Sequence, residues 1–259
     1  MSAAAPFVEA QGARIPALGL GTWNLRGPEC AEAVADALAL GYRHIDTAAM
    51  YGNEREVGQG LRASGAKREE VFVTTKVWSS DIGQGDLQRS AEASLTRLQM
   101  ASVDLLLIHW PNPSIPLKDS IAALCDAKRR GLARHIGVSN FSIDLLRRAI
   151  ALSSEPIIAN QCESHPRHNQ APLIKECRRS GVAFVSYRPL GKGALASDPL
   201  LKRIAAAHGK SAAQVCLRWH VQQGLVAIPK AARREHLAEN FAIFDFALSE
   251  KEMAAISAI

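Results

Sequence analysis

Four side chains suited to proton transfer each follow a short apolar run in the first half of the chain. They are Asp46 and Tyr51 in HIDTAAMYGNE (residues 44–54), Lys76 in TTKVW, and His109 in DLLLIHWP. A tyrosine with its usual pKa of about 10 is a poor proton donor at neutral pH, but a nearby ammonium stabilises the phenolate and lowers that pKa. A carboxylate beside the ammonium keeps the amine charged. This combination predicts a proton-donating site, with His109 as a neutral hydrogen-bond partner for a substrate oxygen.

Each of these residues also has an ordinary structural explanation when it is taken alone. Asp46 could cap a helix, Lys76 could be a solvated strand end, and His109 could be a hydrogen-bonded core histidine. The chemical interpretation therefore depends on elements that bring all of them to one place.

Short β-rich runs alternate with helical patterns along the whole chain. The runs are 14–22, 42–48, 71–78, 103–110, 134–140, 156–161, 182–188 and 225–230, and the clearest helical segments are 29–41, 86–100 and 211–224. Strands joined by helical connections are parallel, and eight such units in about 250 residues are typical of a (β/α)8 barrel. We predict an α/β fold, a single (β/α)8 TIM barrel over residues 1–259 with a short N-terminal β-hairpin cap. The C-terminal ends of its strands would then gather the four side chains at one mouth.

Two glycine-containing stretches imitate nucleotide-binding motifs without completing them. Gly19-Leu20-Gly21 lacks the third glycine of a dinucleotide fingerprint, which disfavours the alternative of an open doubly wound sheet. Gly209-Lys210-Ser211 would need a glycine at position 204 to form a P-loop, where Ile204 stands, and is better explained as a helix cap.

The composition is that of a globular protein, with 47% hydrophobic and 22% charged residues. No apolar run is long enough for a membrane helix, and the first residues lack the pattern of a secretory signal. Five scattered cysteines predict reduced thiols in a cytoplasmic protein and no metal site. The net charge is +6, but the basic clusters 128–130, 147–148 and 178–179 are expected at helix ends, where cations complement the helix dipole. We therefore expect neither nucleic acid nor membrane as a partner.

Several motifs, in order from about residue 7 to 257, resemble the aldo-keto reductase family, with the bacterial 2,5-diketo-gluconate reductase-like branch most similar. They are GLGTW (19–23), HIDTAAMYGNE (44–54), TTKVW (74–78), DLLLIHWP (104–111), IGVSNF (136–141), and IPK with AEN (228–240). The resemblance implies NAD(P)H-dependent reduction of an aldehyde or ketone by direct hydride transfer, without a metal. By position, Tyr51 would be the general acid, Lys76 and Asp46 its tuning pair, and His109 the residue that orients the carbonyl.

The resemblance also implies an extended NADPH groove across the barrel mouth. Ser139, Asn140 and Gln161 would hold the nicotinamide carboxamide, and Tyr187 would stack on the ring. The residues expected to contact the cofactor are Gly21, Thr22, Ser139, Asn140, Gln161, Tyr187, Leu190, Gly191, Lys192, Lys230, Arg233, His236, Glu239 and Asn240. Among these, the loop from Leu190 to Gly193 would approach the pyrophosphate, and Lys230 the adenosine 2′-phosphate.

The phosphate end of this groove departs from the family pattern. Ala231 stands where the family often has Ser, and His236 where many NADPH-preferring members have Arg. A guanidinium is always charged and grips phosphate with two hydrogen bonds, whereas a histidine is mostly neutral at pH 7. We therefore expect a weakened preference for NADPH and use of NADH as well, with Arg233 and Arg234 compensating in part.

The substrate side is expected to be an apolar wall made of Trp23, Met50, Trp78 and Trp110. Loops at the mouth are short, and relatives usually continue past EKEMAAISAI with a tail that folds over the pocket. Either this member lacks that lid, or the tail lies beyond Ile259. A shallow, open pocket predicts a small-molecule carbonyl substrate and broad specificity, and the lack of long insertions favours a monomer. Two alternatives stay open. One is a barrel lyase that forms a Schiff base on Lys76, and the other is a non-catalytic NADP(H)-binding accessory protein.

Overall fold

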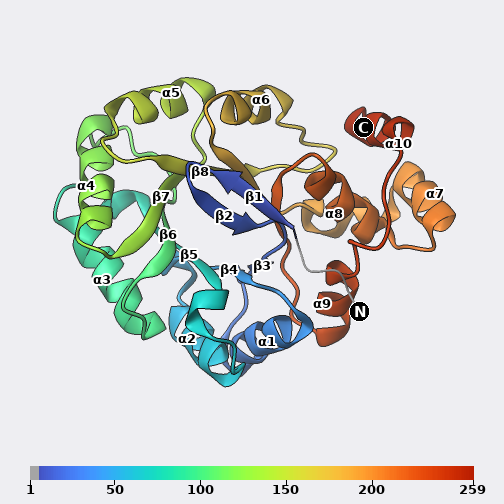
Figure 1. The fold of residues 1–259 in the computed structure, drawn as a ribbon, viewed down its shortest axis with the longest axis horizontal. Helices are drawn as coiled ribbons and strands as arrows, with labels where there is room; N and C mark the ends of the chain where they lie inside the picture. The colour runs from blue at the N-terminus through green and yellow to red at the C-terminus, as the bar shows by residue number, and fades with distance from the viewer. Residues whose placement is uncertain (1–5) are drawn as a thin grey trace.

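Parallel strands form a barrel at the centre of the molecule (Figure 1). The computed structural model describes residues 6–259, so the first residues, which were expected to lack a secretory signal, lie outside the described part. Each of the eight barrel strands pairs with the next along the chain. The strands are β3 (Leu20–Gly21), β4 (His44–Asp46), β5 (Phe72–Val77), β6 (Val103–Ile108), β7 (Ala133–Ser139), β8 (Ile157–Glu163), β9 (Ala183–Tyr187) and β10 (Val226–Ile228).

The barrel closes between its first and last strands. Leu18 forms a parallel bridge with Ala227, and the Gly21 N–H donates to the Pro229 carbonyl over 3.0 Å. A side chain at Gly21 could not be accommodated, because its Cβ would lie 2.7 Å from the Ile228 carbonyl oxygen. The predicted (β/α)8 barrel is confirmed.

Helices surround the strands, as Figure 1 shows. The α-helices within residues 6–259 are α1 (Gly27–Leu40), α2 (Glu54–Ala63), α3 (Asp86–Leu98), α4 (Leu117–Arg129), α5 (Ile143–Leu152), α6 (Ala171–Arg179), α7 (Pro199–His208), α8 (Ala212–Gln222), α9 (Arg234–Phe241) and α10 (Glu250–Ser257). Short 3₁₀ turns are η1 (Ala49–Tyr51), η2 (Arg68–Glu70), η3 (Ser79–Asp81) and η4 (Gly191–Ser197). In this described range, no helix combines the length and the apolar character needed to cross a bilayer.

Local sequence signals set the ends of these helices. Helix α1 stops where Gly41 adopts φ 109°, a left-handed conformation that favours glycine. Helix α8 starts at Ser211, whose hydroxyl accepts from the Gln214 N–H while the Gln214 side chain accepts from the Ser211 N–H. The expectation that Ser211 caps a helix is therefore confirmed.

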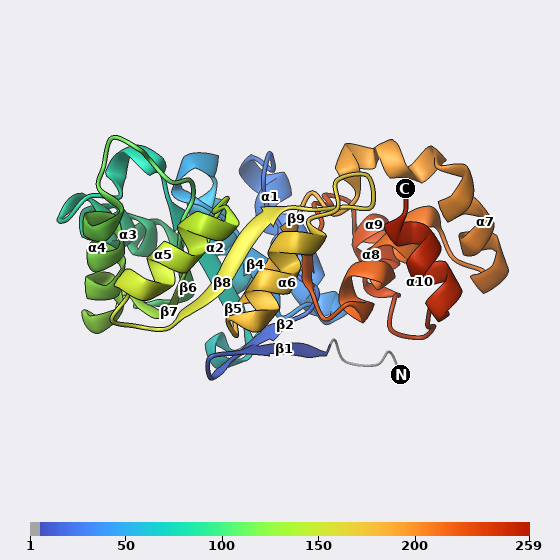
Figure 2. The same ribbon diagram turned by 90° about the horizontal axis from the view of Figure 1, so that it is seen from above.

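A two-stranded antiparallel hairpin covers one end of the barrel. It consists of β1 (Phe7–Ala10) and β2 (Ala13–Pro16), and Figure 2 shows it along one edge of the molecule. Its inward side chains, such as Ile15, pack in one apolar cluster with barrel-interior residues of β6, β8, β9 and β10. The hairpin thus forms the floor of the barrel, as the predicted N-terminal cap.

Two details of the sequence-based prediction are wrong. The run 14–22 is not one strand, because its first part pairs within the hairpin and only Leu20–Gly21 belongs to the barrel. The pair Arg147-Arg148 lies in the middle of α5, not at its end. Arg147 instead forms an ion pair with Glu176, 2.7 Å away. The clusters at 128–130 and 178–179 do coincide with the ends of α4 and α6.

Strand β6 illustrates why the barrel strands read as nearly continuous apolar runs. Leu105 and Leu107 belong to the barrel interior, whereas Leu106 and Ile108 pack in the layer beneath the helices. Side chains of a strand alternate between faces, so a strand buried on both faces needs apolar residues at every position.

Helix α2, which follows the Tyr51 turn, packs unusually closely on both neighbours. A Cβ on Gly58 would lie 2.9 Å from the Leu98 carbonyl carbon at the end of α3. A Cβ on Gly60 would lie 2.7 Å from Val34 Cβ on α1. These two glycines therefore fix how near α2 sits to the helices on either side.

We expect Gly58→Ala to lower the free energy of unfolding by about 1–3 kcal/mol, because overpacking against backbone outweighs the better helix propensity of alanine. Urea denaturation measures the change. Gly83→Ala is the matched control, because the nearest atom to its Cβ is Asp86 Oδ2 at 3.9 Å. Equal stability of the two variants would contradict the close-packing explanation.

Candidate active site

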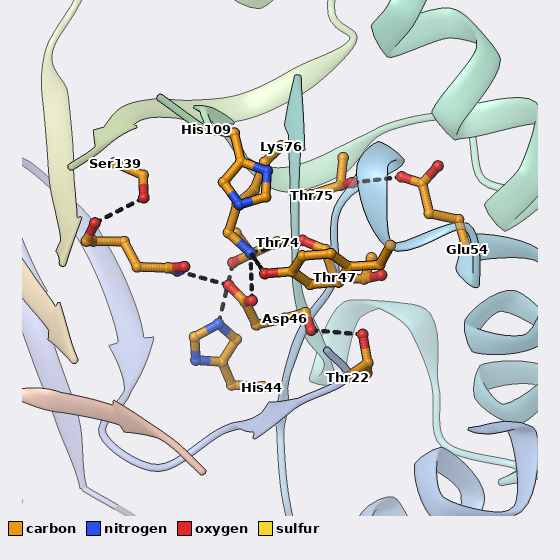
Figure 3. A network of polar contacts seen from close by, with 12 residues as sticks. Thr22, His44, Asp46, Thr47, Glu54, Thr74, Thr75, Lys76, His109 and Ser139 are labelled. Carbon is orange, nitrogen blue, oxygen red and sulfur yellow. Dashed lines mark hydrogen bonds and ion pairs between the residues drawn. The ribbon is translucent and has the colours of Figure 1, made fainter. Parts of the chain in front are cut away.

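The carboxyl ends of β4, β5 and β6 bring the predicted proton-transfer residues together (Figure 3). Asp46 is the last residue of β4, Lys76 lies one residue before the end of β5, and His109 directly follows β6. Tyr51 reaches the same place from η1, the turn between β4 and α2. All four are buried, and Tyr51 is the most exposed at 9%.

The Lys76 ammonium is the centre of this group. Its Nζ donates to Asp46 Oδ1 at 2.5 Å, to the Thr47 carbonyl oxygen at 2.9 Å and to Tyr51 Oη at 3.2 Å. An ammonium has three N–H donors, so these acceptors use all of them. Because Lys76 donates to Tyr51 Oη, the phenol proton must point elsewhere, and Tyr51 lines the adjoining pocket.

Burial and neighbouring charges act in opposite directions on these groups. Burial alone would lower the pKa of Lys76, but the Asp46 carboxylate and the Tyr51 oxygen raise it above its usual value. For Tyr51, burial raises the pKa above its usual value and the Lys76 ammonium opposes that rise only in part. The lowering effect of Lys76 predicted from the sequence is therefore present, but burial outweighs it. Both groups keep their protons at neutral pH.

His109 lies between Tyr51 and Trp78, with edge-on ring contacts at centroid distances of 5.6 Å and 5.2 Å. Burial, together with the positive charge of Lys76, lowers the pKa of His109 to about 3. The imidazole is consequently neutral at ordinary pH. Within residues 6–259, its buried Nδ1 has no hydrogen-bond partner.

A pocket opens directly above these groups. Its walls include Trp23, Met50 and Trp110, which are 39%, 40% and 43% exposed despite their size. The Trp23 ring also contacts the Tyr51 ring edge-on, at a centroid distance of 4.9 Å. One side of the pocket thus offers an apolar surface next to the phenol proton.

A chain of hydrogen bonds leads from Asp46 to the opposite side of the pocket. Gln161 Nε2 donates to Asp46 Oδ2 at 2.7 Å, and Ser139 Oγ donates to the Gln161 carbonyl at 2.7 Å. Asn140 Nδ2 donates to Ser139 Oγ at 3.0 Å, and Tyr187 Oη donates to Asn140 Oδ1 at 3.0 Å. The two oxygens of Asp46 therefore connect the lysine to a polar pocket wall.

The site thus combines a buried tyrosine, lysine, aspartate and histidine at the mouth of a (β/α)8 barrel. The sequence also matches a protein-family model over most of its length. A model described as the Aldo/keto reductase family matches residues 17–259. The chain belongs to the aldo/keto reductase family. The family predicted from the sequence motifs is thereby confirmed.

Relatives of this aldo/keto reductase include proteins of known structure and named activity. A glyoxal reductase of Bacillus subtilis is 42% identical over 249 residues, which are 96% of this chain and 90% of that protein. A crystal structure whose assignment as 2,5-diketo-D-gluconic acid reductase B is provisional has 45% identity and a TM-score of 0.96, over 98% of this chain and 90% of that one. An aldo-keto reductase of Bombyx mori, solved in complex with NADP, has 35% identity and a TM-score of 0.92, over 98% and 92% of the two chains.

In this aldo/keto reductase, part of the predicted cofactor set lines the same pocket as Tyr51. These residues are Gly21, Asn140, Gln161, Tyr187 and Lys230. Thr22 does not face the pocket, because it is fully buried and its hydroxyl donates to the Asp46 carbonyl at 3.0 Å. Ser139 is buried behind the pocket wall and reaches it only through Asn140 and Gln161.

The predicted phosphate loop forms a tight turn after β9. Gly191, Lys192 and Gly193 all have left-handed φ angles, of 55°, 55° and 88°. The Gly191 and Gly193 N–H groups already donate to the Arg188 and Leu190 carbonyls, both at 2.9 Å. The loop is therefore held in shape by its own backbone, and these two N–H groups are not free for a phosphate in this conformation.

The predicted adenosine end lies along α9. Arg233 donates to His236 Nε2, and His236 Nδ1 lies 3.5 Å from Glu239 Oε2. Arg234 does not face this group, because it pairs with Asp36 on α1. Asn240 is buried, at 5% exposure. Of the two arginines expected to compensate for His236, only Arg233 is beside it.

Trp78 is the one predicted substrate residue that does not line this pocket. Its ring packs edge-on against His109 and borders a neighbouring surface groove next to Met50. Arg188, which the sequence analysis missed, does line the pocket beside Tyr187 and pairs with Glu163 at 3.0 Å. It directly follows β9, so the same strand-end rule that selected Lys76 could have found it.

Asn53 and Arg26 were also missed, and both hold the backbone around Tyr51. Asn53 is 1% exposed and its Nδ2 donates to the Thr22 and Leu25 carbonyls at 2.8 Å and 3.1 Å. Arg26 Nη1 donates to the Tyr51 carbonyl at 2.6 Å. No sequence signal identifies these contacts, because they depend on how the loop after β3 folds against η1.

We expect the ring signals of His109 to stay those of a neutral imidazole from about pH 5 to pH 8, because a lowered pKa delays protonation to lower pH. The imidazole should take up its proton only as the pH falls toward about 3. NMR titration measures this, with His109→Asn identifying the signals. A titration midpoint near the usual value of roughly 6.5 would contradict the predicted shift.

Proposed function

We propose that this protein reduces a small aldehyde or ketone to an alcohol with NADPH as hydride donor, and that Tyr51 donates the proton. The observation that carries the proposal is the contact between Tyr51 Oη and Lys76 Nζ at 3.2 Å, on the wall of an apolar pocket. This contact leaves the phenol proton available to a bound substrate oxygen.

The pocket residues fit a nicotinamide dinucleotide. Asn140, Gln161 and Tyr187 line the pocket, where their amides and ring suit a nicotinamide. Lys230 adds a cation to the pocket. It forms no ion pair within residues 6–259, so its ammonium can bind a phosphate. The NADP complex of the Bombyx mori relative supports the same cofactor. When bound, NADPH supplies the hydride for the carbonyl carbon.

The side chains then have separate tasks in the reaction. Tyr51 donates its proton to the carbonyl oxygen, and the Lys76 ammonium stabilises the phenolate that remains. Asp46 keeps Lys76 charged and in place. His109, whose imidazole is neutral and lines the pocket, hydrogen-bonds the carbonyl oxygen and orients it toward Tyr51.

The walls of the pocket support a small substrate. Trp23, Met50 and Trp110 form an exposed apolar rim that imposes few polar requirements. The glyoxal reductase activity named for the Bacillus subtilis relative fits such a pocket, and we propose small aldehydes, dicarbonyls and keto sugars as substrates. Five buried cysteines, none in a disulfide, support a reducing, cytoplasmic location.

Lys76 does not suit the alternative of a Schiff-base lyase. A nucleophilic lysine requires a lowered pKa, whereas the pKa of Lys76 is raised and its three donors are all engaged. A purely binding role would leave the buried ion pair and the pocket-facing phenol without a purpose.

We expect Tyr51→Phe to lower kcat/KM for carbonyl reduction by about 10²–10⁴-fold, the usual contribution of a general acid, with NADPH binding kept. Assays use NADPH oxidation with an aldehyde panel, and quenching of tryptophan fluorescence measures binding. Tyr42→Phe is the matched control, because its hydroxyl donates to the Leu237 carbonyl away from the pocket. Activity of Tyr51→Phe within tenfold of the parent would overturn the assignment of Tyr51.

We expect the ratio of kcat/KM for NADPH over NADH to stay well below about 10³, because His236 lacks the planar set of N–H donors with which an arginine holds a phosphate. His236→Arg should raise this ratio roughly tenfold by adding a charge-assisted contact. Steady-state kinetics with both cofactors measure it. A thousandfold preference in the parent protein, or an unchanged ratio in the variant, would contradict the expectation.

A further inference from the structure

The stretch HIDTAAMYGNE ends in a glutamate that the proposed chemistry does not use. Glu54 is the first residue of α2, three positions after Tyr51, and its side chain has no exposed surface. Burial of a carboxylate is costly unless it is paired and hydrogen-bonded. Its partners therefore indicate what the residue is for.

Both oxygens of Glu54 are engaged, and they bind residues on different elements. Oε1 accepts a short hydrogen bond of 2.5 Å from Thr75 Oγ1 on β5, and Figure 3 shows the two side chains facing each other. Oε2 accepts from Arg97 Nε on α3 at 2.7 Å and forms an ion pair with Arg97 Nη2, also at 2.7 Å. Arg97 neutralises the carboxylate and holds its orientation, which leaves Oε1 directed at the strand.

The partner on β5 is the residue directly before Lys76. Side chains alternate along a strand, so Lys76 points into the barrel mouth while Thr75 points outward to the helices. The Glu54–Thr75 bond therefore joins the Tyr51 segment to the Lys76 strand on the outside of the barrel. The Tyr51–Lys76 contact at 3.2 Å joins the same two segments on the inside.

We propose that Glu54 is a positioning residue for proton transfer, which sets the distance between Tyr51 Oη and Lys76 Nζ through its hydrogen bond to Thr75. The inference rests on the proposed role of Tyr51 as general acid. Asn53 completes the positioning from the other side, because its amide accepts from Thr47 Oγ1 at 2.9 Å and donates to the loop after β3.

The influence of Glu54 is mechanical. The perturbed pKa values of Lys76 and Tyr51 arise from burial, from Asp46, from Arg188 and from each other. Glu54 does not belong to that set of charges. A change in its contacts should therefore act on the chemical step through geometry and leave the cofactor groove as it is.

Thr75→Val tests the proposal, because it removes the hydroxyl at nearly constant volume, and Thr75→Ser is the matched variant that keeps the hydroxyl. We expect Thr75→Val to lower kcat roughly tenfold, as small displacements at a reacting centre do, with the Kd for NADPH changed by less than about threefold. Thr75→Ser should keep at least about half of the parent kcat. Glu54→Gln has only one acceptor oxygen and so cannot accept from both Thr75 and Arg97. It should behave like Thr75→Val and carries the test if Thr75→Val does not fold.

The pH dependence adds a readout that a purely structural role would not move. The Lys76 ammonium lowers the pKa of Tyr51, so a longer distance should raise that pKa and move the alkaline limb of kcat for reduction to higher pH. A folded Thr75→Val or Glu54→Gln variant with kcat within twofold of the parent would overturn the proposal, as would a loss of NADPH affinity in parallel with kcat. Tyr51→Phe on the same substrates separates the two ideas. If Tyr51→Phe stays active, the proposed function is wrong. If Tyr51→Phe is inactive while Thr75→Val and Glu54→Gln stay active, only the positioning role of Glu54 is wrong.

Discussion

The buried ammonium of Lys76 is the constraint on which the rest of the site depends. A lysine without solvent exposure would ordinarily lose its proton, because burial disfavours the charged form. It stays charged because Asp46, the Thr47 carbonyl and Tyr51 each accept a hydrogen bond from the ammonium. Those acceptors lie on β4 and on the turn that follows it, so β4, β5 and η1 must keep one fixed arrangement. Removal of any acceptor would leave an unsatisfied charge in the interior.

Asp46 extends this constraint to the other side of the pocket. One carboxylate oxygen binds Lys76, and the other accepts from Gln161 on β8, which adjoins Ser139 and Asn140. The residues that surround the proposed proton donor and those proposed for the nicotinamide thus belong to one hydrogen-bonded network. Beyond it, Asn53, Arg26 and Glu54 hold the turn that carries Tyr51. The proposed catalytic geometry therefore depends on residues that do not line the pocket.

The sequence alone predicted the barrel and the convergence of Asp46, Tyr51, Lys76 and His109, because strand-end positions follow from hydrophobic patterning and a known architecture. Contacts between elements could not be predicted from the sequence in the same way. The role of Thr22 inside the fold, the outward position of Trp78 and the pairing of Arg147 with Glu176 all depend on side-chain packing, which has no local signal. The pKa of Tyr51 shows the same limit. The motif predicted that the charge of Lys76 lowers this pKa, but it gave no sign that burial raises the pKa by more.

The hairpin at the bottom of the barrel has a consequence for the order in which the protein can fold. Its Ile15 packs against interior residues of β8, β9 and β10, and Leu18 pairs with Ala227. The hairpin residues therefore complete their contacts only after almost the entire barrel has been made. Contacts of such large sequence separation form slowly and together. The barrel thus acquires its floor and its last wall in the same late step, and the pocket, which Ile228 and Lys230 help to line, is complete only then.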